Sequence, residues 1–537
     1  VYGATPGGIA AAVTLAERGH QVALLEPQAT IGGMMAGGLG RTDFGSIHAL
    51  GGLFKQYLAE VSVHYTETYG ADSPQAKVMR GGLYFESHVA RMILERWVAA
   101  SPNLQLLRQA HLVGVKCVNG RVAAVVIQDR ERAVRRTLAA RLFVDASYEG
   151  DLAAMAGAPY LIGRESREQY GEPHAGELWW NVWERRVVEV VGTGDRKVQA
   201  YNYRLCLTRQ VDNRLPPPPP RVYDRGRYAS LLPDIAAGRL KRLKDIIDIL
   251  ELPGSKADAN NHPQGNPSSD LIGGADDYPE ANYRQRQAIA LEHRDHILGL
   301  LWFLRFDPEV PEALRLDAQQ WGLARDEFPE TESWPSQLYV REGRRLLGEV
   351  VFSQRDAMAA PGSERSPIRA DSVAVGAYPM DSHATGGRHP QHPELLEGFF
   401  YLARGETKPY QIPYAIMLPR GLHNVAMVCC VSSTHIGYGT LRMEPVFMAL
   451  GLAAAVAGDH ALHGGRQLDD LSVARLQWDL LRQGQVLTVF EDVEVGSRGW
   501  AALNYLGTRG CFATYLAQPD EALTGTELQG WLAALPW

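Results

Sequence analysis

A short glycine-rich segment at the start of the chain constrains the fold more than any other feature. It reads Val-Tyr-Gly-Ala-Thr-Pro-Gly-Gly from Val1 to Gly8. Gly3 permits a tight turn off a strand, and Gly8 allows the following helix to pack closely on a sheet. A helix that begins near Pro6 and Gly7 directs free backbone N–H groups and the positive end of its dipole at the turn. The segment therefore predicts a site for the pyrophosphate of a dinucleotide.

One position departs from the usual glycine pattern, because Thr5 stands where a second glycine is expected. The context still favours a dinucleotide site. Residues 8–18 predict a helix of small residues, and residues 21–25 predict an apolar strand that ends at Glu26. A carboxylate about 20 positions past the turn accepts hydrogen bonds from ribose hydroxyls and repels a 2′-phosphate. NADP is therefore disfavoured, whereas NAD and FAD both suit the motif.

Composition and charge exclude several classes of protein. The chain has 537 residues, of which 45% are hydrophobic and 21% charged, and it carries a net charge of −7. These values are typical of a globular protein of about two or three domains. The acidic balance argues against nucleic-acid partners. No apolar run approaches the length of a bilayer-spanning helix, and no signal peptide is visible, so we expect a cytoplasmic protein without a membrane span.

Three further stretches carry local structure. Residues 31–43 hold many glycines, which indicates a backbone lying against something flat or anionic. Residues 111–145 alternate as strands do, with a hairpin signal at Asn119-Gly120, and predict a β-meander. Helices are expected at residues 51–69, 86–100, 227–250, 280–306 and 311–325.

No metal site is expected. The cysteine spacing is not that of a zinc site. His293 and His296 share one face of the helix expected at 280–306, but no carboxylate–histidine pattern accompanies them. We therefore expect these two histidines to be surface residues.

A second strand–loop–helix unit lies near the C-terminal end. Residues 425–431 predict a strand, residues 432–440 a loop, and residues 446–457 a helix of small residues that follows Pro445. The N-terminus of such a helix is suited to hold a developing negative charge.

The chain resembles a large group of bacterial FAD-dependent oxidoreductases with the glutathione-reductase-like flavin fold. The motifs that carry the resemblance span the chain to about residue 460. They are Gly3–Gly8, Glu26, Gly32-Gly33-Met34, Phe143–Leu152, Leu338–Arg345, Tyr378–His383 and Ser433–Gly451.

The resemblance implies non-covalent FAD. Glu26 would hold the ribose and Val113 would meet the adenine through its backbone. The Gly32–Thr42 loop would lie along the ribityl chain and ring, and the Arg442–Pro445 turn would meet the pyrimidine side of the ring. The residues expected to bind FAD are Gly3, Thr5, Pro6, Gly7, Gly8, Glu26, Pro27, Gly32, Gly33, Met34, Leu39, Arg41, Thr42, Val113, Ala146, Ser147, Asp151, Arg442, Met443, Glu444 and Pro445.

The expected fold is α/β, with a discontinuous Rossmann-like FAD-binding domain that includes the β-meander. Residues 1–160 and 401–460 would form this domain, residues 161–400 an inserted α+β substrate domain, and residues 461–537 a mainly helical C-terminal region.

The expected reaction is hydride transfer from a small-molecule substrate, such as an alcohol or a sugar hydroxyl carbon, to flavin N5. Histidine is suited to take the hydroxyl proton near neutral pH. His435 is the first candidate and His383 the second, while Arg341 and Arg345 either clamp a polar substrate or pair with Glu342 and Glu349. For Arg442 and Glu444 the alternative to a contact with FAD is a pair with each other.

Several functions stay open at this stage. The electron acceptor is undetermined. An FAD-dependent monooxygenase or a reductase of an activated double bond would use a related fold, and a non-catalytic FAD-binding protein is an alternative of another class.

Overall fold

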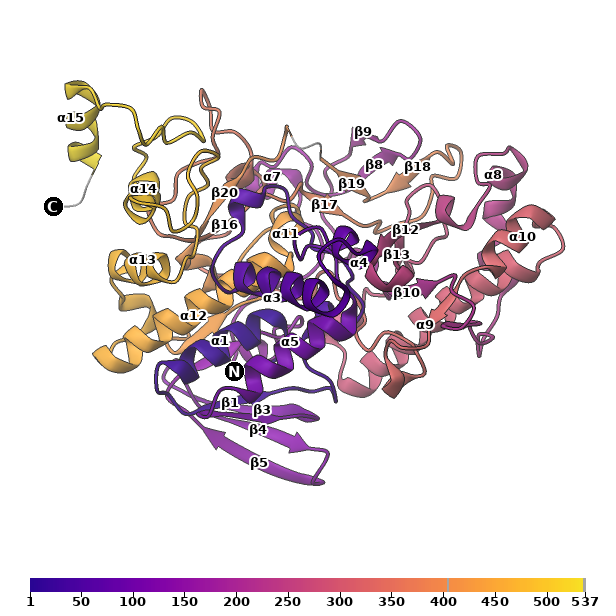
Figure 1. The fold of residues 1–537 in the computed structure, drawn as a ribbon, viewed down its shortest axis with the longest axis horizontal. Coiled ribbons are helices and arrows are strands. Elements are labelled where there is room, and N and C mark those ends of the chain that lie inside the picture. Colours follow the sequence, from indigo (N-terminus) through magenta and orange to yellow (C-terminus); the bar gives the residue numbers. More distant parts are fainter. Residues whose placement is uncertain (403–404, 535–537) are drawn as a thin grey trace.

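The structure is a computed structural model that describes residues 1–402 and 405–534. The predicted segments 401–460 and 461–537 therefore include five residues outside this description. The molecule is elongated, with α13–α15 at one end and α9 and α10 at the other (Figure 1). Their bounds are α9 (Tyr283–Phe306), α10 (Glu312–Gln319), α13 (Val473–Arg482), α14 (Trp500–Gly507) and α15 (Gly525–Ala534).

A parallel sheet at the centre joins segments that are far apart in the chain. Strand β1 (Val22–Leu25) pairs with β2 (Leu104–Leu107), and β6 (Phe143–Asp145) pairs with β21 (Val425–Met427). Tyr2 bridges the two pairs through Leu25 and Asp145. Strands β1, β6 and β21 are short and largely buried, as expected for a parallel sheet covered on its faces, whereas β2 is more exposed.

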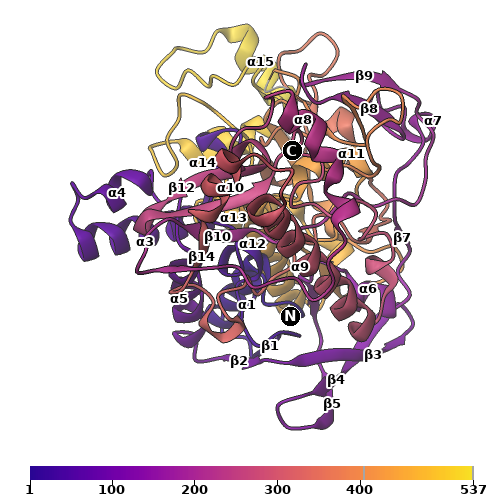
Figure 2. The same ribbon diagram turned by 90° about the vertical axis from the view of Figure 1, so that its right-hand side faces the viewer.

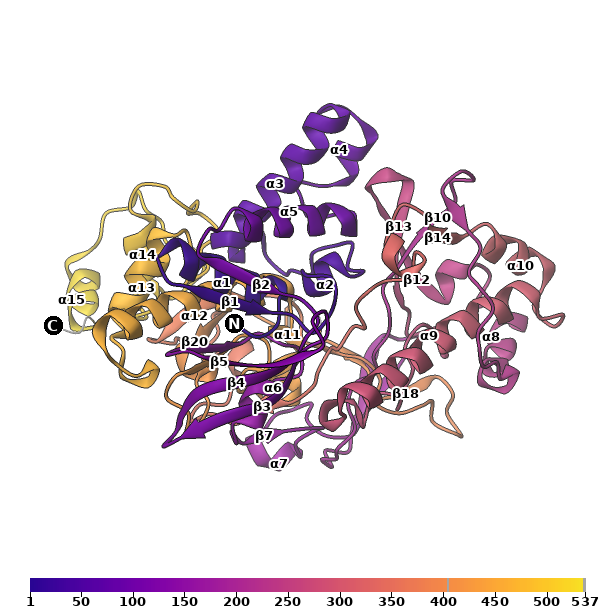
Figure 3. The ribbon, with the colours of Figure 1, turned by 90° about the horizontal axis from the view of Figure 1, so that it is seen from below.

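Two parallel helices pack on each other beside this sheet. They are α1 (Pro6–Glu17) and α12 (Glu444–Gly464). Small residues allow the close approach, since a Cβ added to Gly451 would lie 2.0 Å from the carbonyl oxygen of Gly7. Helices α3 (Gly52–Tyr69) and α5 (Ser87–Ala99) lie nearby, as Figures 1 and 3 show. The first two elements after Gly3 are thus the predicted helix and strand.

The β-meander forms as predicted. Its strands are β3 (Ala110–Val118), β4 (Arg121–Asp129) and β5 (Val134–Ala139), all antiparallel. Asn119 and Gly120 both have positive φ at the hairpin, of 49° and 70°. Figure 2 shows the meander below the parallel sheet.

The middle of the chain is mixed. Five strands form an antiparallel sheet in the order β11-β14-β10-β13-β12, and β8, β9 and β18 form a smaller one. The bounds are β8 (Leu178–Asn181), β9 (Arg186–Val190), β10 (Leu205–Thr208), β11 (Arg214–Leu215), β12 (Ile247–Leu252), β13 (Lys256–Asn261), β14 (Gly322–Ala324) and β18 (Leu395–Glu397). Short ladders pair β7 (Tyr160–Leu161) with β15 (Arg345–Leu346), β16 (Ser372–Gly376) with β20 (Tyr410–Pro413), and β17 (Asp381–Ser382) with β19 (Phe400–Tyr401). Further short helices are α2 (Gly33–Ala36), α4 (Pro74–Val78), α6 (Asp151–Met155), α7 (Arg167–Tyr170), α8 (Leu232–Ala236) and α11 (His435–Leu441).

Three local expectations were wrong. Residues 227–250 are not one helix, because α8 is followed by Gly238 at φ 69° and residues 247–252 form β12 against β13. The helix expected at 311–325 ends at Gln319, and the strand expected at 425–431 ends at Met427. In the first two segments, pairing with a distant strand overrides the local pattern, and in the third the strand ends where its pairing with β6 ends.

His293 and His296 are buried rather than on the surface. They lie on the inner face of α9, where burial lowers the pKa of each imidazole to about 4. His296 Nε2 lies 2.9 Å from the carbonyl oxygen of Ser268.

Among residues 1–402 and 405–534, one helix, α12, is long and apolar enough to cross a membrane by length and composition, contrary to the expectation from the sequence. Most of it is buried against its neighbours, as in the core helix of a globular protein. The helix is thus weak evidence for a membrane span.

Candidate functional site

The glycine-rich turn has the geometry that the sequence predicted. Gly3 has φ 92°, and a Cβ added to Gly8 would lie only 1.9 Å from the carbonyl oxygen of Gly3. Thr5 caps α1, because its hydroxyl oxygen accepts a hydrogen bond from Gly8 N–H at 3.1 Å. The same hydroxyl donates to the carbonyl of Ala146 at 2.8 Å. Thr5 therefore ties the turn to the end of β6, which explains a threonine at the position of the second glycine.

A cavity of about 500 Å³ opens in front of this turn. It is lined by the turn, the end of β1, the start of β3, the segment after β6 and the first turns of α9. The predicted cofactor-binding residues that line it are Gly3, Thr5, Glu26, Pro27, Gly33, Ser147 and Asp151. The structure thus brings motifs from three separate parts of the sequence to one cavity.

Glu26 lies at the wall of the cavity and is 7% exposed. Its carboxylate accepts hydrogen bonds from the backbone N–H groups of Ala4 and Gln28, each at 2.8 Å. Burial nevertheless raises the pKa of Glu26 to about 7. The carboxyl group therefore spans from β1 to the turn and presents oxygen acceptors to a ligand in the cavity.

The far side of the cavity has an aromatic pair that the sequence did not reveal. Tyr283, the first residue of α9, stacks on His111 with ring centroids 4.0 Å apart. Its hydroxyl contacts Tyr2 and accepts from Leu112 N–H at 3.3 Å. Val113 lies at an irregularity of β3, is 43% exposed and is not among the lining residues. No signal in the sequence linked α9 to this cavity, because the contact spans two distant segments.

The segment from Gly32 to Thr42 is buried and turns sharply. Gly32 has φ 98°, and Met34 and Leu39 are almost inaccessible. Met34 N–H donates to the Tyr148 hydroxyl at 3.0 Å, and that hydroxyl donates to Glu444 at 2.6 Å. The first glycine-rich segments and the start of α12 are therefore held together by one tyrosine.

Arg442 and Glu444, at the start of α12, do not pair with each other. Arg442 pairs with Asp381 on β17 rather than with Glu444, so the alternative of an Arg442–Glu444 pair is wrong. Glu444 contacts Tyr148 instead, and burial raises its pKa to about 8. Met443 is the N-cap residue and Pro445 lies in the first turn. This turn is therefore tied on one side to β17 and on the other to the Gly32–Met34 segment.

Asp151 forms ion pairs with two arginines, Arg286 and Arg344. Arg286 from α9 donates to it at 2.6 and 2.9 Å, and Arg344 donates at 2.7 Å. Burial opposes its ionisation, but these two arginines lower its pKa overall. Asp151 thus anchors α9 against the wall of the cavity.

His435 is the first residue of α11, not part of a loop as the sequence suggested, and it is 2% exposed. Its Nδ1 lies 2.8 Å from Glu342 Oε2, and its Nε2 lies 3.2 Å from the Ser382 hydroxyl. Burial opposes ionisation of Glu342, yet His435 and Arg345 lower the pKa of that carboxyl to about 2. Both ring nitrogens of His435 are therefore engaged within the protein.

His383 follows Ser382 and has a different environment. Its Nδ1 lies 2.5 Å from Asp270 Oδ2, and Arg341 pairs with the other oxygen of Asp270 at 3.0 Å. Its side chain is 10% exposed, and no described residue forms a hydrogen bond with Nε2. Burial, and then the charge of Arg341, lower the pKa of His383. His383 is therefore a neutral imidazole near pH 7 with one nitrogen held and the other free.

Arg341 and Arg345 each pair with carboxylates of the protein. Arg345 pairs with Glu342, as one of the two alternatives predicted, and with Glu165 at 2.6 Å. Arg341 pairs with Asp270, while Glu349 pairs with Arg420. Both arginines thus pair with buried carboxylates, although Arg341 Nε has no hydrogen-bond partner among the described residues.

FAD fits these residues. The turn offers a helix N-terminus without obstructing Cβ atoms, and Glu26 offers acceptors for ribose hydroxyls. Four buried polar atoms on the segments implied for the flavin have no hydrogen-bond partner among the described residues. These atoms are Arg41 Nε, Thr42 Oγ1, Arg442 Nε and Glu444 Oε2. Unpaired buried polar atoms are costly, so a polar ligand edge at these positions would satisfy them.

Comparisons with known proteins agree with this cofactor. A family model described as FAD dependent oxidoreductase matches residues 1–480. No curated protein matches the chain.

Three solved structures with partial similarity illustrate the range of neighbours. Glycerol-3-phosphate dehydrogenase from Bacillus halodurans, complexed with FAD, is 14% identical over 32% of this chain and 40% of its own, with a TM-score of 0.22. L-proline dehydrogenase from P. horikoshii is 16% identical over 31% and 24%, with a TM-score of 0.17. p-Nitrophenol 4-monooxygenase from Pseudomonas putida is 13% identical over 34% and 47%, with a TM-score of 0.19. The chain therefore spans less than half the length of each of these structures.

Proposed function

The chain belongs to the family of FAD-dependent oxidoreductases, and from this premise we propose that it oxidises a hydroxyl-bearing small molecule with His383 as the proton acceptor. The protein is a flavoenzyme, and FAD is its cofactor. The observation that carries the proposal is the Asp270–His383 pair, in which Nε2 of His383 has no hydrogen-bond partner among the described residues.

The roles of the side chains follow from elementary proton chemistry. Asp270 accepts the Nδ1 proton of His383, which fixes the tautomer and leaves the lone pair on Nε2. A neutral imidazole with a lowered pKa can take the hydroxyl proton of an alcohol near neutral pH. Asp270 then stabilises the imidazolium that forms, as in other carboxylate–histidine pairs. Bound FAD supplies the acceptor for the hydride that leaves the substrate carbon.

The link between His383 and the cofactor runs through β17. Asp381 is two residues before His383 and pairs with Arg442, which precedes the first turn of α12. Arg442 belongs to the turn implied for the pyrimidine side of the flavin. The proton acceptor and the cofactor-binding turn are thus joined by one ion pair, which supports their acting at the same substrate.

We assign His435 a positioning role instead of the catalytic role that it has as first candidate. Both ring nitrogens of His435 are engaged within the protein. One of them contacts the hydroxyl of Ser382, which immediately precedes His383, so His435 holds this part of the chain in place. Arg341 is likewise a positioning residue, because its pair with Asp270 holds the carboxylate that orients His383.

We also infer that residues 1–160 and 401–460 act as one cofactor-binding unit and that α9 contributes to it from residues 161–400. Support comes from the parallel pair of β6 and β21 and from the packing of α1 on α12. It also comes from Tyr283 and Arg286 at the cavity wall.

The decisive experiment measures anaerobic reduction of the bound FAD by a panel of alcohols and sugars. His383→Gln keeps a hydrogen-bonding side chain but cannot serve as the base. Reduction should slow about 10²–10⁴-fold, the range for loss of a general base. His392→Gln, an exposed histidine on another loop, is the matched control and should reduce at the wild-type rate.

The pH profile separates the roles of the two histidines. In the wild type, reduction should fall as pH drops below the pKa of His383, which lies under its ordinary value. His383→Gln should abolish this dependence, whereas His435→Gln should retain it at a lower rate. Equal reduction rates in His383→Gln and the wild type would refute the proposal. Reduction by NADPH alone, without any alcohol, would instead favour the monooxygenase alternative.

A further inference from the structure

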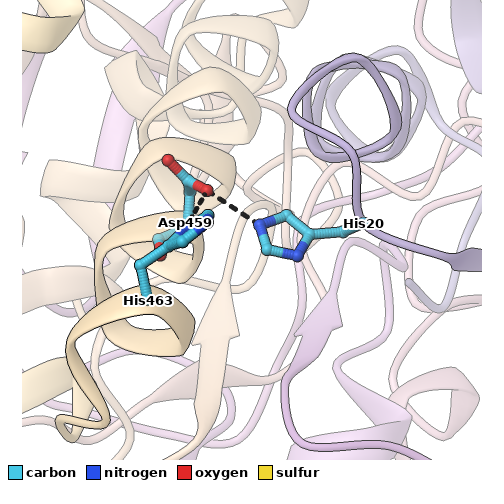
Figure 4. Close-up of side chains that lie close together, drawn as sticks. All are labelled: His20, Asp459 and His463. Carbon is cyan, nitrogen blue, oxygen red and sulfur yellow. Dashed lines mark hydrogen bonds and ion pairs between the residues drawn. The ribbon is translucent and has the colours of Figure 1, made fainter.

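Three metal-ligating side chains meet at the C-terminal ends of α1 and α12. Figure 4 shows His20 directed from the end of α1 toward Asp459 and His463 on the last turns of α12. His20 Nε2 and His463 Nδ1 each lie 2.8 Å from the same oxygen, Asp459 Oδ1. The three donor atoms lie within 4.8 Å of one another. Such spacing allows them to share one ion after small side-chain rotations.

Neighbouring groups orient Asp459 and add negative potential at these three side chains. Arg18 donates to Asp459 Oδ2 at 2.6 Å, which fixes the carboxylate and leaves Oδ1 directed at the two histidines. Outer partners of this kind orient metal ligands in proteins. Both helices end here, so the negative ends of two helix dipoles add to the charge of Asp459. The two helix ends therefore favour a positive ion here and offset part of the charge of Arg18.

Solvent can complete the coordination. The His463 side chain is 69% exposed, whereas those of His20 and Asp459 are 16% and 11% exposed. A tetrahedral ion held by two imidazoles and one carboxylate would keep its remaining position for water. The two less exposed donors hold an ion from the protein side, and the exposed His463 gives the ion an entry path.

A second cluster of metal-ligating residues shows the contrast. Glu86, His88 and Glu327 also lie close together, but Lys256 Nζ is placed among them, 2.6 Å from Glu86 and 2.9 Å from Glu327. That ammonium bridges the two carboxylates, at the position where a metal ion would have to bind. At the end of α12 the only cation on the carboxylate, among the described residues, is Arg18 on the opposite oxygen.

We propose that His20, Asp459 and His463 form a binding site for a divalent transition metal ion of the Zn²⁺, Ni²⁺ or Cu²⁺ class. Two imidazoles and a carboxylate are the donors that such ions prefer. The bound ion links α1 to α12 at the ends opposite to the cofactor-binding turns. It is therefore a structural clamp and takes no part in the proposed oxidation.

The test uses the FAD-loaded full chain after dialysis against a chelator. Zn²⁺ is titrated in competition with a chelating dye, and the wild type should bind one equivalent. His463→Ala and His20→Ala should each weaken Zn²⁺ binding at least tenfold. His460→Ala is the matched control, because His460 lies on the same helix but pairs with Asp479 on α13. It should bind Zn²⁺ as the wild type does.

Two further readouts distinguish a site from simple ion pairing. Zn²⁺ should raise the Tm of the wild type and of His460→Ala, but not of His463→Ala, whose exposed side chain can be removed without disturbing the core. Cu²⁺ bound to the wild type should show nitrogen hyperfine couplings in its electron paramagnetic resonance spectrum that His463→Ala reduces. Failure of the wild type to bind Zn²⁺, or unchanged binding in both variants, would overturn the proposal. In that case the three side chains are only a proton-dependent ion pair network.

Discussion

A single methyl group at Gly8 should weaken FAD binding strongly. In Gly8→Ala the new Cβ would lie 1.9 Å from the Gly3 carbonyl oxygen and 3.0 Å from the Ala146 Cβ. An ordinary contact between these atom types is about 3.5 Å. Relief of the clash therefore needs a displacement of the turn of more than about 1 Å, close to half of that contact distance. Gly3 has little freedom to move, because its own Cβ position faces the Ala146 backbone at 2.7 Å. The backbone N–H groups of the turn are therefore displaced together.

The structure sets the scale of this effect. Overpacking of a closely packed site costs about 1–3 kcal/mol. If this cost falls on the conformation that binds the pyrophosphate, the Kd for FAD rises about 5- to 150-fold. Part of the cost will also appear as lower stability of the protein without cofactor, because the turn is strained in both states.

The assay is the quenching of FAD fluorescence on titration with deflavinated protein, alongside urea unfolding of the same samples. Gly530→Ala is the matched control, since this helical glycine of α15 has no atom within 4 Å of an added Cβ. It should leave the Kd unchanged. A Kd for Gly8→Ala within twofold of the wild type would refute the idea that this turn holds the cofactor.

Two other predictions concern buried charges. The pKa of Glu444 is about 8 in the folded state against 4.5 in the unfolded state, so the unfolded state loses its proton first and stability falls as pH rises from about 4.5 to about 8. The Tm of Glu444→Gln should therefore fall less than that of the wild type between pH 5 and pH 9. Identical losses of Tm would contradict the assignment. Arg345→Met leaves Glu342 and Glu165 buried without their cation, and should lower the free energy of unfolding by about 3–5 kcal/mol in urea. Arg196→Met, at an exposed pair, should change it by less than about 1 kcal/mol.

The sequence predicted the parts of the site that are encoded locally. The turn at Gly3–Gly8, the strand that ends at Glu26 and the hairpin at Asn119-Gly120 each follow from neighbouring residues, and each appears in the structure. The pair of Arg345 and Glu342 is also local, three residues apart, and was one of two alternatives.

The partners that decide the chemistry could not be predicted in this way. Asp270 is 113 residues from His383, and Tyr283 is 171 residues from its hydrogen-bond partner Leu112. Nothing in the local pattern distinguishes Asp270 from other aspartates, and its contact with His383 forms only in the folded chain. The expected helix at 227–250 failed for the same reason, because β12 exists only through its pairing with β13. Local patterns therefore predict the cofactor, whereas long-range packing forms the surroundings of His383, the proposed proton acceptor.

The parallel packing of α1 on α12 has a consequence for how the chain acquires its structure. The hydrogen bond between Arg18 and Asp459 joins residues 441 positions apart, and that between Thr5 and Cys429 joins residues 424 positions apart. Contacts between such distant residues slow folding, because loop closure comes before any stabilisation. During synthesis, α1 emerges long before its neighbour α12 exists, whereas β1 meets its partner β2 much earlier. The face of α1 that packs on α12 is exposed throughout that interval, so we expect newly made chains to be prone to aggregation until α12 has been translated.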